Sequence, residues 1–271
     1  MATYNSSKYL KPQIDSLLNQ TYKEFTLYIR DDGSQDETIA IINKYQQQQQ
    51  NIILLNDPIK NREAMGSFIW LLESIEADYY MFCDHDDIWL ENKIELSMAK
   101  MQKIESPNTP SLIFTDLRVV TEDLNIIAPS MWRYEKLRPK LLTQKRFATT
   151  KNIFTGCTML INNQAKQISL PISPKAIMHD SWIGLRVIAH NGNIGYIQEP
   201  QLLYRQHGNN AVGSAPIENN LNYYLSKLKN IPQILKKWDK IYIMASSAFE
   251  IRIPFFQYYL WKFTYLIIRW F

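Results

Sequence analysis

Short apolar runs alternate with helical segments over the first 116 residues, and this alternation constrains the fold more than any other feature of the chain. Strands are predicted at residues 25–29, 51–55, 79–83 and 112–115. Helices are predicted at 36–50, 67–76 and after Trp89, where apolar residues recur at helical spacing. Near-continuous apolar strands are typical of a parallel sheet covered on both faces. The pattern therefore predicts an α/β fold built from βαβ units.

Other elements are predicted with less regular spacing. Pro12 fits the first turn of a helix that begins near residues 9–11 and continues to residue 20. Beyond Asp116, a strand is expected at 155–161 and a helix at 179–189, with Gly192 just past its end. Two short strands, 193–198 and 201–206, are expected on either side of Pro200.

Composition excludes several classes of protein. A hydrophobic content of 46% and an aromatic content of 13% exclude intrinsic disorder as the main state. Cys83 and Cys157 are the two cysteines, too few for a disulfide-stapled domain, and they are expected to be buried packing residues. The first residues show no signal-peptide pattern, which predicts folding in the cytoplasm. A net charge of +4 is too small to indicate nucleic-acid binding.

Acidic residues gather where two predicted strands end. Asp31 and Asp32 follow one strand, and Asp84, Asp86 and Asp87 follow another. Ligands of open α/β sheets bind at the carboxyl ends of the strands. Because clustered carboxylates repel one another, the second group indicates a bound cation, for which Mg²⁺ and Mn²⁺ are the natural choices. The alternative is that Asp86 or Asp87 caps a helix beginning near residue 90.

Six segments, taken in order, resemble family 2 glycosyltransferases: ATYNSSKYL, IRDDGSQDET, FCDHDDIW, FTGCTMLIN, MHDSW and YRQHGNN. The variants DHDDIW, HDSW and LYRQHGNN are most similar to bacterial rhamnosyltransferase-type members that build surface polysaccharides. The resemblance covers residues 1–215 and implies an inverting, nucleotide-sugar-dependent enzyme. It also implies the GT-A fold, a Rossmann-like, mixed but mostly parallel sheet with helices on both faces.

The resemblance assigns roles to individual positions. Thr3 and Tyr4 would line the nucleoside pocket, and Asp32, with Asp31 beside it, would hydrogen-bond the base. The full nucleotide-binding set is Thr3, Tyr4, Asp31, Asp32, Ser67, Asp84 and Arg205, and the metal ligands are Asp84, Asp86 and His207. Asp180 matches the catalytic base, which would take the proton of the acceptor hydroxyl in a single, inverting displacement.

Simpler interpretations remain open for some of these residues. Asp180 would serve equally well as the N-cap of the helix at 179–189, and His207 as the cap of a turn. Trp182 is either a platform for the acceptor sugar or part of the core.

The chain also departs from the family pattern in two places. Met1 lies near the end of the first strand, which relatives begin several apolar residues earlier. Glu63 stands where a turn usually has glycine, and this costs backbone freedom if its φ is positive.

The last nineteen residues, 253–271, include nine aromatic residues. Lys262 and Arg269 fall within roughly 20° of each other on a helix, and lysines are frequent over 227–240. This pattern predicts that 216–271 form a helical extension lying in the membrane interface rather than spanning the bilayer. The alternatives are a helix that packs back on the catalytic domain and one that forms a homodimer seam.

These observations predict a metal-dependent glycosyltransferase, peripheral on the cytoplasmic face of the cell membrane. Its donor would be a nucleotide-diphosphate sugar, with rhamnose as the expected sugar, and its acceptor a lipid-linked saccharide. The rival interpretations are a metal-dependent nucleotidyltransferase or phosphoesterase, a non-catalytic glycan- or lipid-binding module, and an inactive relative.

Overall fold

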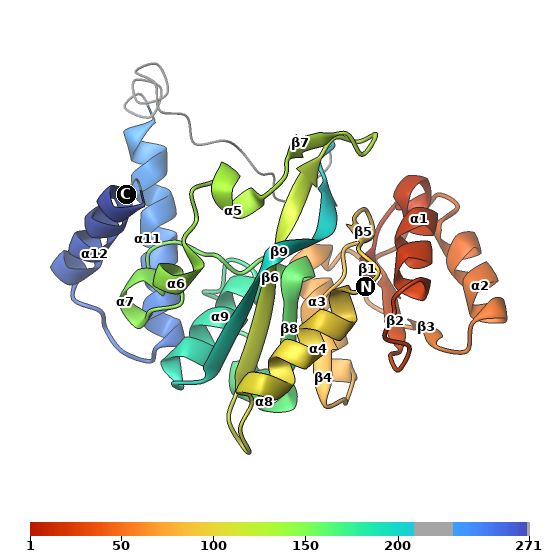
Figure 1. The fold of residues 1–271 in the computed structure, drawn as a ribbon, viewed down its shortest axis with the longest axis horizontal. Helices are drawn as coiled ribbons and strands as arrows, with labels where there is room; N and C mark the ends of the chain where they lie inside the picture. Colours follow the sequence, from red (N-terminus) through yellow and green to blue (C-terminus); the bar gives the residue numbers. More distant parts are fainter. Residues whose placement is uncertain (209–229, 270–271) are drawn as a thin grey trace.

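Two β-sheets follow one another along the longest axis of the molecule in the computed structural model, which describes residues 1–208 and 230–269 (Figure 1). The first sheet is parallel and contains, in order, β1 (Ala2–Thr3), β2 (Leu27–Asp31) and β3 (Ile52–Leu55). The second has the order β4 (Tyr79–Met81), β8 (Met159–Asn162), β6 (Ser111–Val120), β9 (Asn193–Arg205) and β5 (Ile88–Trp89), with β7 (Ile126–Ala128) paired to β6. Here β6 and β9 are parallel, whereas β4 and β6 pair antiparallel with β8.

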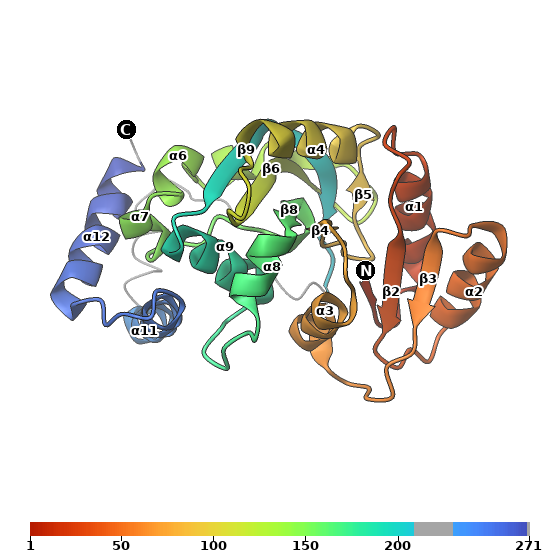
Figure 2. The ribbon, with the colours of Figure 1, turned by 90° about the horizontal axis from the view of Figure 1, so that it is seen from below.

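Helices cover these sheets on both faces. The helices are α1 (Ser7–Leu18), α2 (Thr38–Gln48), α3 (Glu63–Ser74), α4 (Lys93–Ile104), α5 (Met131–Tyr134), α6 (Pro139–Leu142), α7 (Lys145–Ala148), α8 (Asn163–Ser169), α9 (His179–Ala189), α11 (Ile231–Ala248) and α12 (Phe255–Ile268). Figure 2 shows α4 on one face of the second sheet and α8 and α9 on the other. The predicted α/β fold with a mixed sheet is confirmed, and its antiparallel pairs lie in the second sheet.

Three predicted elements differ in detail from the structure. The helix containing Pro12 begins at Ser7, a turn earlier than predicted. The first part of the strand expected at 155–161 is a 3₁₀ turn, Gly156–Thr158, and the strand starts at Met159. The two strands predicted around Pro200 are one strand, because the register of β9 against β6 shifts where Pro200 lies opposite Asp116. A bulge accommodates a proline that a regular ladder excludes.

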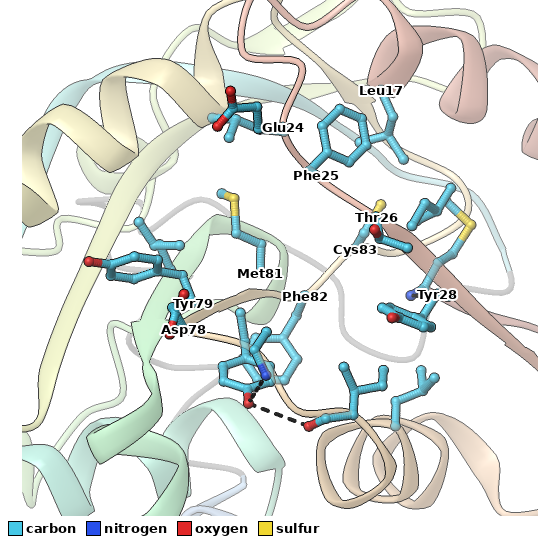
Figure 3. Close-up of a pocket in the computed structure, with 18 of the residues that line it drawn as sticks. Leu17, Glu24, Phe25, Thr26, Tyr28, Asp78, Tyr79, Met81, Phe82 and Cys83 are labelled. Atoms are coloured by element: carbon cyan, nitrogen blue, oxygen red, sulfur yellow. Dashed lines mark hydrogen bonds between the residues drawn. The ribbon is translucent and has the colours of Figure 1, made fainter. Parts of the chain in front are cut away.

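The strand order is interrupted between β1 and β4, each of which is the edge strand of its own sheet. A cavity of about 760 Å³ lies here, lined by residues that include Phe25, Tyr28, Tyr79, Met81 and Phe82 (Figure 3). Its lining comes from the start of β2 and from β4 and the residues flanking it. The cavity therefore lies at the interruption of the strand order, and its lining includes Cys83, which directly precedes Asp84.

Trp182 and the two cysteines belong to the core. Trp182 is buried, and its indole nitrogen donates a hydrogen bond of 2.8 Å to the main-chain oxygen of Ser169. The interpretation of Trp182 as a sugar platform is therefore wrong. Cys83 and Cys157 are free and buried, as predicted.

The C-terminal helices pack at the end of the molecule opposite α1 and α2 (Figures 1 and 2). In α12, Tyr258, Lys262 and Tyr265 are buried, and the ammonium group of Lys262 donates to the main-chain oxygen of Thr150. This face of the helix thus packs back on the protein, as the alternative interpretation expected, and Lys262 is not part of an exposed cationic face. In the described part of the chain, every helix is too short or too polar to cross a bilayer. The predicted boundary at 215/216 lies outside the described residues, as do Lys227 and Lys229.

The buried Lys262 predicts a pH-dependent stability. Burial lowers the pKa of Lys262 to about 7, so this amine is neutral in the folded protein at pH 9 but binds a proton in the unfolded chain. Between pH 7 and about 10 the unfolded chain therefore binds more protons than the folded protein. Over this range the free energy of unfolding of the protein rises with pH, by up to about 1.4 kcal/mol per pH unit. Lys262→Met should be more stable than wild type at pH 7 and should reduce this rise, as measured by urea unfolding at several pH values.

Lys236→Met is the matched control, since Lys236 is exposed on α11 and its replacement should leave the pH dependence unchanged. Parallel stability curves for wild type and Lys262→Met would contradict the expected role of burial.

Candidate active site

Residues from distant parts of the chain meet beyond the strand ends. The loop after β4 carries Asp84, Asp86 and Asp87, the residues at and after the end of β9 include Arg205 and His207, and Asp180 lies in the first turn of α9. This edge of an α/β sheet is where ligands bind when the crossover connections leave a crevice. The structure thus brings together segments that lie up to 121 residues apart in the sequence.

Asp86 and His207 are in direct contact. The Nε2 atom of His207 lies 2.9 Å from Oδ2 of Asp86, and both side chains are largely buried. Arg205 holds the same loop in place, because its Nε donates a hydrogen bond of 2.8 Å to the main-chain oxygen of Asp86. The two residues that the sequence predicts as metal ligands from opposite ends of the domain therefore lie side by side.

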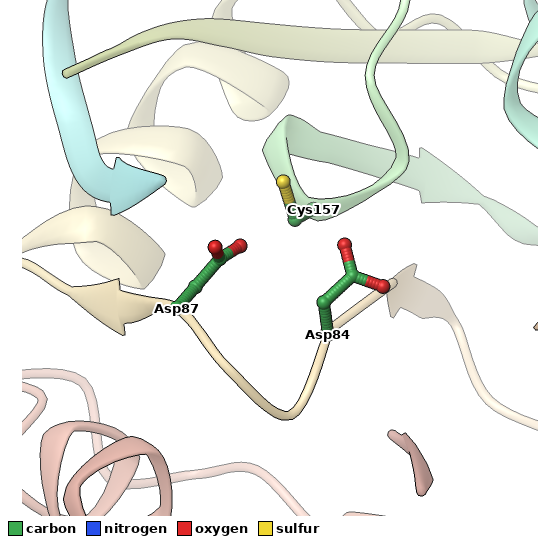
Figure 4. A group of neighbouring side chains, drawn as sticks. All are labelled: Asp84, Asp87 and Cys157. Carbon is green, nitrogen blue, oxygen red and sulfur yellow. The ribbon is translucent and has the colours of Figure 1, made fainter. Parts of the chain in front are cut away.

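Asp84 groups with Asp87 and Cys157 (Figure 4). One potential ligand atom from each of these three residues lies within 4.8 Å of the others. Burial, with the charges of Asp86 and Asp180, raises the pKa of Asp84 to about 7, and burial also raises the pKa values of Asp87 and of the Cys157 thiol. Burial therefore disfavours the ionised form of these groups, and a bound cation would offset that cost.

The sequence underestimated Asp87 and Cys157. It offered Asp86 or Asp87 as a helix cap, but α4 begins at Lys93 after Asn92, so that interpretation is wrong. It treated Cys157 as packing alone, although the thiol lies beside two carboxylates. The one available signal was the third acid in DHDD, since a helix cap needs only one.

Asp180 lies close enough to Asp84 for its charge to act on it. Its carboxylate accepts hydrogen bonds from the main-chain nitrogens of Gly156, at 3.0 Å, and Ser181, while its charge contributes to the raised pKa of Asp84. Burial raises the pKa of Asp180 itself to about 6. The N-cap of α9 is Met178, so the N-cap interpretation of Asp180 is wrong. A half-buried carboxylate whose pKa lies just below neutrality suits a general base.

The residues predicted for the nucleoside side are held in hydrogen bonds. Asp31 accepts from the Thr3 hydroxyl at 2.9 Å and from the main-chain nitrogens of Gly33 and Ser34 at 3.0 and 2.8 Å. These contacts fix the turn after β2. Tyr4 follows β1 and is 52% exposed, so its side chain is available to a ligand.

Arg30 organises the neighbouring carboxylates, and the sequence analysis missed it. Its buried guanidinium donates to Asp32 at 2.7 Å, to Asp57 at 2.8 Å and to the Ser67 hydroxyl at 2.6 Å. Asp32 also accepts from the main-chain nitrogens of residues 62 and 63 at the start of α3. The available signal was an arginine inside an apolar strand, which is rarely buried without a partner.

Glu63 has a φ of 58°, so the backbone strain expected at this position is present. A left-handed conformation costs a non-glycine residue roughly 1–2 kcal/mol. The hydrogen bond of 2.9 Å from the Glu63 main-chain nitrogen to Asp32 helps to hold this conformation.

The carboxylates fit a hard divalent cation. Carboxylate oxygens suit Mn²⁺ or Mg²⁺, and the contact between His207 and Asp86 places an imidazole nitrogen beside one of them. In an α/β fold, the carboxyl ends of the strands are where ligands bind.

The chain belongs to glycosyl transferase family 2, whose family model matches residues 1–167. It is 26% identical to "dTDP-rhamnosyl transferase RfbG" of Shigella flexneri over 88% of this chain and 80% of the relative. It is 25% identical to "UDP-Glc:alpha-D-GlcNAc-diphosphoundecaprenol beta-1,3-glucosyltransferase WfgD" of Escherichia coli over 73% of each chain. The predicted family is therefore confirmed.

Solved structures agree on the fold. TarS 1–349 of S. aureus in complex with UDP-GlcNAc matches with a TM-score of 0.58 and 18% identity, over 93% of this chain and 70% of that one. The mannosyltransferase PcManGT of Pyrobaculum calidifontis, in complex with GDP-Man and Mn²⁺, matches with a TM-score of 0.56 and 12% identity, over 92% and 70%. In the UDP complex of TarS 1–349 this chain spans 59% of the solved chain. The fold is thus the predicted GT-A fold.

The Arg30 network predicts a large stability effect. Arg30→Met leaves the carboxylates of Asp32 and Asp57 buried without their shared cation, and the free energy of unfolding should fall by about 3–5 kcal/mol. Chemical denaturation monitored by circular dichroism measures the change. Arg252→Met is the control, because Arg252 is exposed and its loss should cost no more than about 0.5 kcal/mol. Equal losses in the two variants would contradict the role given to Arg30.

Proposed function

We propose that the protein transfers a sugar, with inversion, from a nucleotide-diphosphate donor to a saccharide hydroxyl. The observation that carries this proposal is the 2.9 Å contact between His207 and Asp86. Asp180 lies near the same group of acids, since its charge acts on the pKa of Asp84. A cation-binding pair and a separate carboxylate base are the two elements that a single displacement requires.

Each side chain has a defined task in this reaction. Asp86 and His207, with Asp84 near them, would hold Mn²⁺ or Mg²⁺, which when bound supplies Lewis-acid stabilisation of the diphosphate leaving group. Asp180 accepts the proton of the attacking hydroxyl. With a pKa of about 6, Asp180 is ionised at pH 7.5 and still basic enough to accept that proton.

The proposed nucleoside contacts are made by Thr3, Tyr4, Asp31, Asp32 and Ser67, with Asp84 on the ribose and Arg205 near the diphosphate. Tyr4 offers an exposed ring, while Arg30 fixes the positions of Asp32 and Ser67. Arg205 is buried and bonds to main-chain oxygens of Asp86 and Glu122, so it acts on the diphosphate mainly by its charge.

The donor and acceptor are proposed from the relatives. RfbG is named for dTDP-rhamnose, and the alignment with it spans most of both chains, which supports rhamnose as the sugar. The name of WfgD specifies an acceptor on diphosphoundecaprenol, which supports a lipid-linked saccharide. Surface polysaccharide synthesis is the process that unites these two activities.

A lipid-linked acceptor calls for a membrane-facing surface, and α12 has one. Phe256, Leu260, Phe263 and Ile267 are each more than half exposed and recur at helical spacing. On α11, Lys236, Lys237 and Lys240 are exposed nearby. An apolar stripe flanked by cations suits the interface of an anionic membrane. We therefore propose peripheral attachment on the cytoplasmic face, with a second copy of the chain as the competing occupant.

Nucleotide binding tests the proposed reaction. In a thermal-shift series with dTDP, UDP and GDP, wild type should be stabilised by one of these more strongly with Mn²⁺ than without it, because a tight ligand raises apparent stability. Asp86→Asn should lose the Mn²⁺-dependent part. Asp180→Asn should keep the full shift but lose more than about a thousandfold in turnover, since it retains the donor site and lacks the base.

Product analysis separates the rival reactions. Release of the nucleoside diphosphate indicates sugar transfer, whereas release of pyrophosphate would indicate nucleotidyl transfer. Near wild-type turnover by Asp180→Asn would remove this residue as the base, and a wild type that no nucleotide stabilises would favour a non-catalytic module.

Vesicle binding tests the surface of α12. The double variant Phe256→Ser and Phe263→Ser should bind vesicles containing anionic lipid at least about tenfold more weakly than wild type in a sedimentation assay, because two large apolar contacts are lost. Ile126→Ser is the control, since Ile126 is 59% exposed on β7 at a distance from α12. A wild-type protein that forms dimers through the exposed face of α12 and does not bind vesicles would contradict the membrane proposal.

A further inference from the structure

Tyr9 lies beneath the proposed metal-binding pair, although no part of the reaction described above uses it. Its ring stacks on the imidazole of His207, with 4.8 Å between ring centroids and an angle of 19° between planes. The guanidinium carbon of Arg205 lies 5.0 Å from the centroid of the same ring. One half-buried aromatic side chain of α1 thus contacts both functional residues at and beyond the end of β9.

The hydroxyl of Tyr9 is anchored on the other side. It donates a hydrogen bond of 2.9 Å to Oε1 of Glu122, which lies in the hairpin between β6 and β7. Lys8 forms an ion pair with the same carboxylate. The tip of the Tyr9 ring is therefore fixed by a residue 113 positions away in the sequence. A side chain that only fills space does not need such an anchor.

These contacts form a closed circuit around the loop after β4. The main-chain oxygen of Glu122 accepts from Arg205, and Arg205 donates to the main-chain oxygen of Asp86. Asp86 contacts His207, and His207 stacks on Tyr9, which returns to Glu122. A closed circuit restrains each member more than an open chain of the same contacts, because a shift at one point strains all the others.

We propose that Tyr9 is a positioning residue, which fixes the plane of the His207 imidazole so that its Nε2 points to the site shared with Asp86. This inference rests on the proposed metal-dependent function. An imidazole rotates about two side-chain bonds, and a stacking partner removes one of these freedoms. Residues that orient a metal-binding histidine typically change metal affinity by tenfold or more when they are removed.

The test compares Mn²⁺ affinity among three variants, measured by electron paramagnetic resonance of free Mn²⁺ with dTDP present and UDP in parallel. Tyr9→Leu removes the ring and should raise the Kd for Mn²⁺ about tenfold. Tyr9→Phe keeps the stack and should remain within about threefold of wild type. Glu122→Ala frees the tip of the ring and should give about a threefold increase even if Tyr9→Leu fails to fold.

The control is Tyr45→Leu, because Tyr45 is a partly buried tyrosine of α2 whose hydroxyl also bonds to a carboxylate, that of Asp15. It should lower stability without changing Mn²⁺ affinity. Mn²⁺ affinity within twofold of wild type in both Tyr9→Leu and Glu122→Ala would overturn the inference while leaving the metal site intact. A wild type that binds no Mn²⁺, or that binds it no more tightly than Asp86→Asn does, would instead refute the proposed function.

Discussion

Burial of closely spaced carboxylates is the constraint on which the candidate active site depends. Burial is the largest cause of the raised pKa values of Asp84 and Asp180, about 7 and 6. The charges of Asp86 and Asp180 add to the shift of Asp84, and those of Asp84 and Asp86 add to the rise in the pKa of Asp87. Buried carboxylates that lie this close together favour a bound cation, and burial alone brings the pKa of Asp180 near the range of a general base.

The acids that follow β2 and β3 are stabilised differently, because a buried arginine neutralises them. Asp32 and Asp57 share the buried Arg30, and hydrogen bonds from Arg62, first, and from Arg30 hold the pKa of Asp57 below its usual range. Charge is therefore balanced inside the protein around Arg30, whereas the acids of the loop after β4 group with a cysteine thiol and a histidine. This contrast favours the loop after β4 over the turn after β2 as the place for the proposed cation, although both positions carry adjacent aspartates.

Local patterns predicted what depends on local physics. The βαβ alternation and the acids at strand ends follow from short segments, so the fold was predictable from them, whereas the convergence of Asp86 with His207 was expected only from the resemblance to a family. Contacts that no local sequence pattern signals were not predictable. The stack of Tyr9 on His207 and the hydrogen bond of Tyr9 to Glu122 join segments more than a hundred residues apart. The burial of Lys262 against Thr150 likewise depends on where the preceding chain leaves a main-chain oxygen to accept a hydrogen bond.

The burial of Lys262 shows how the last helix is arranged. Tyr258, Lys262 and Tyr265 form one face, and Phe256, Leu260, Phe263 and Ile267 form another about 200° around the helix. The sequence pattern alone assigned the aromatic and cationic residues to one membrane-interfacial helix. In the structure, Lys262 lies with two tyrosines on the buried face, and the exposed stripe is apolar. Since the buried lysine fixes the rotation of α12 against the protein, the exposed stripe always points outward. Docking on the catalytic domain and binding to a lipid surface therefore do not compete, because each uses its own face of the same helix.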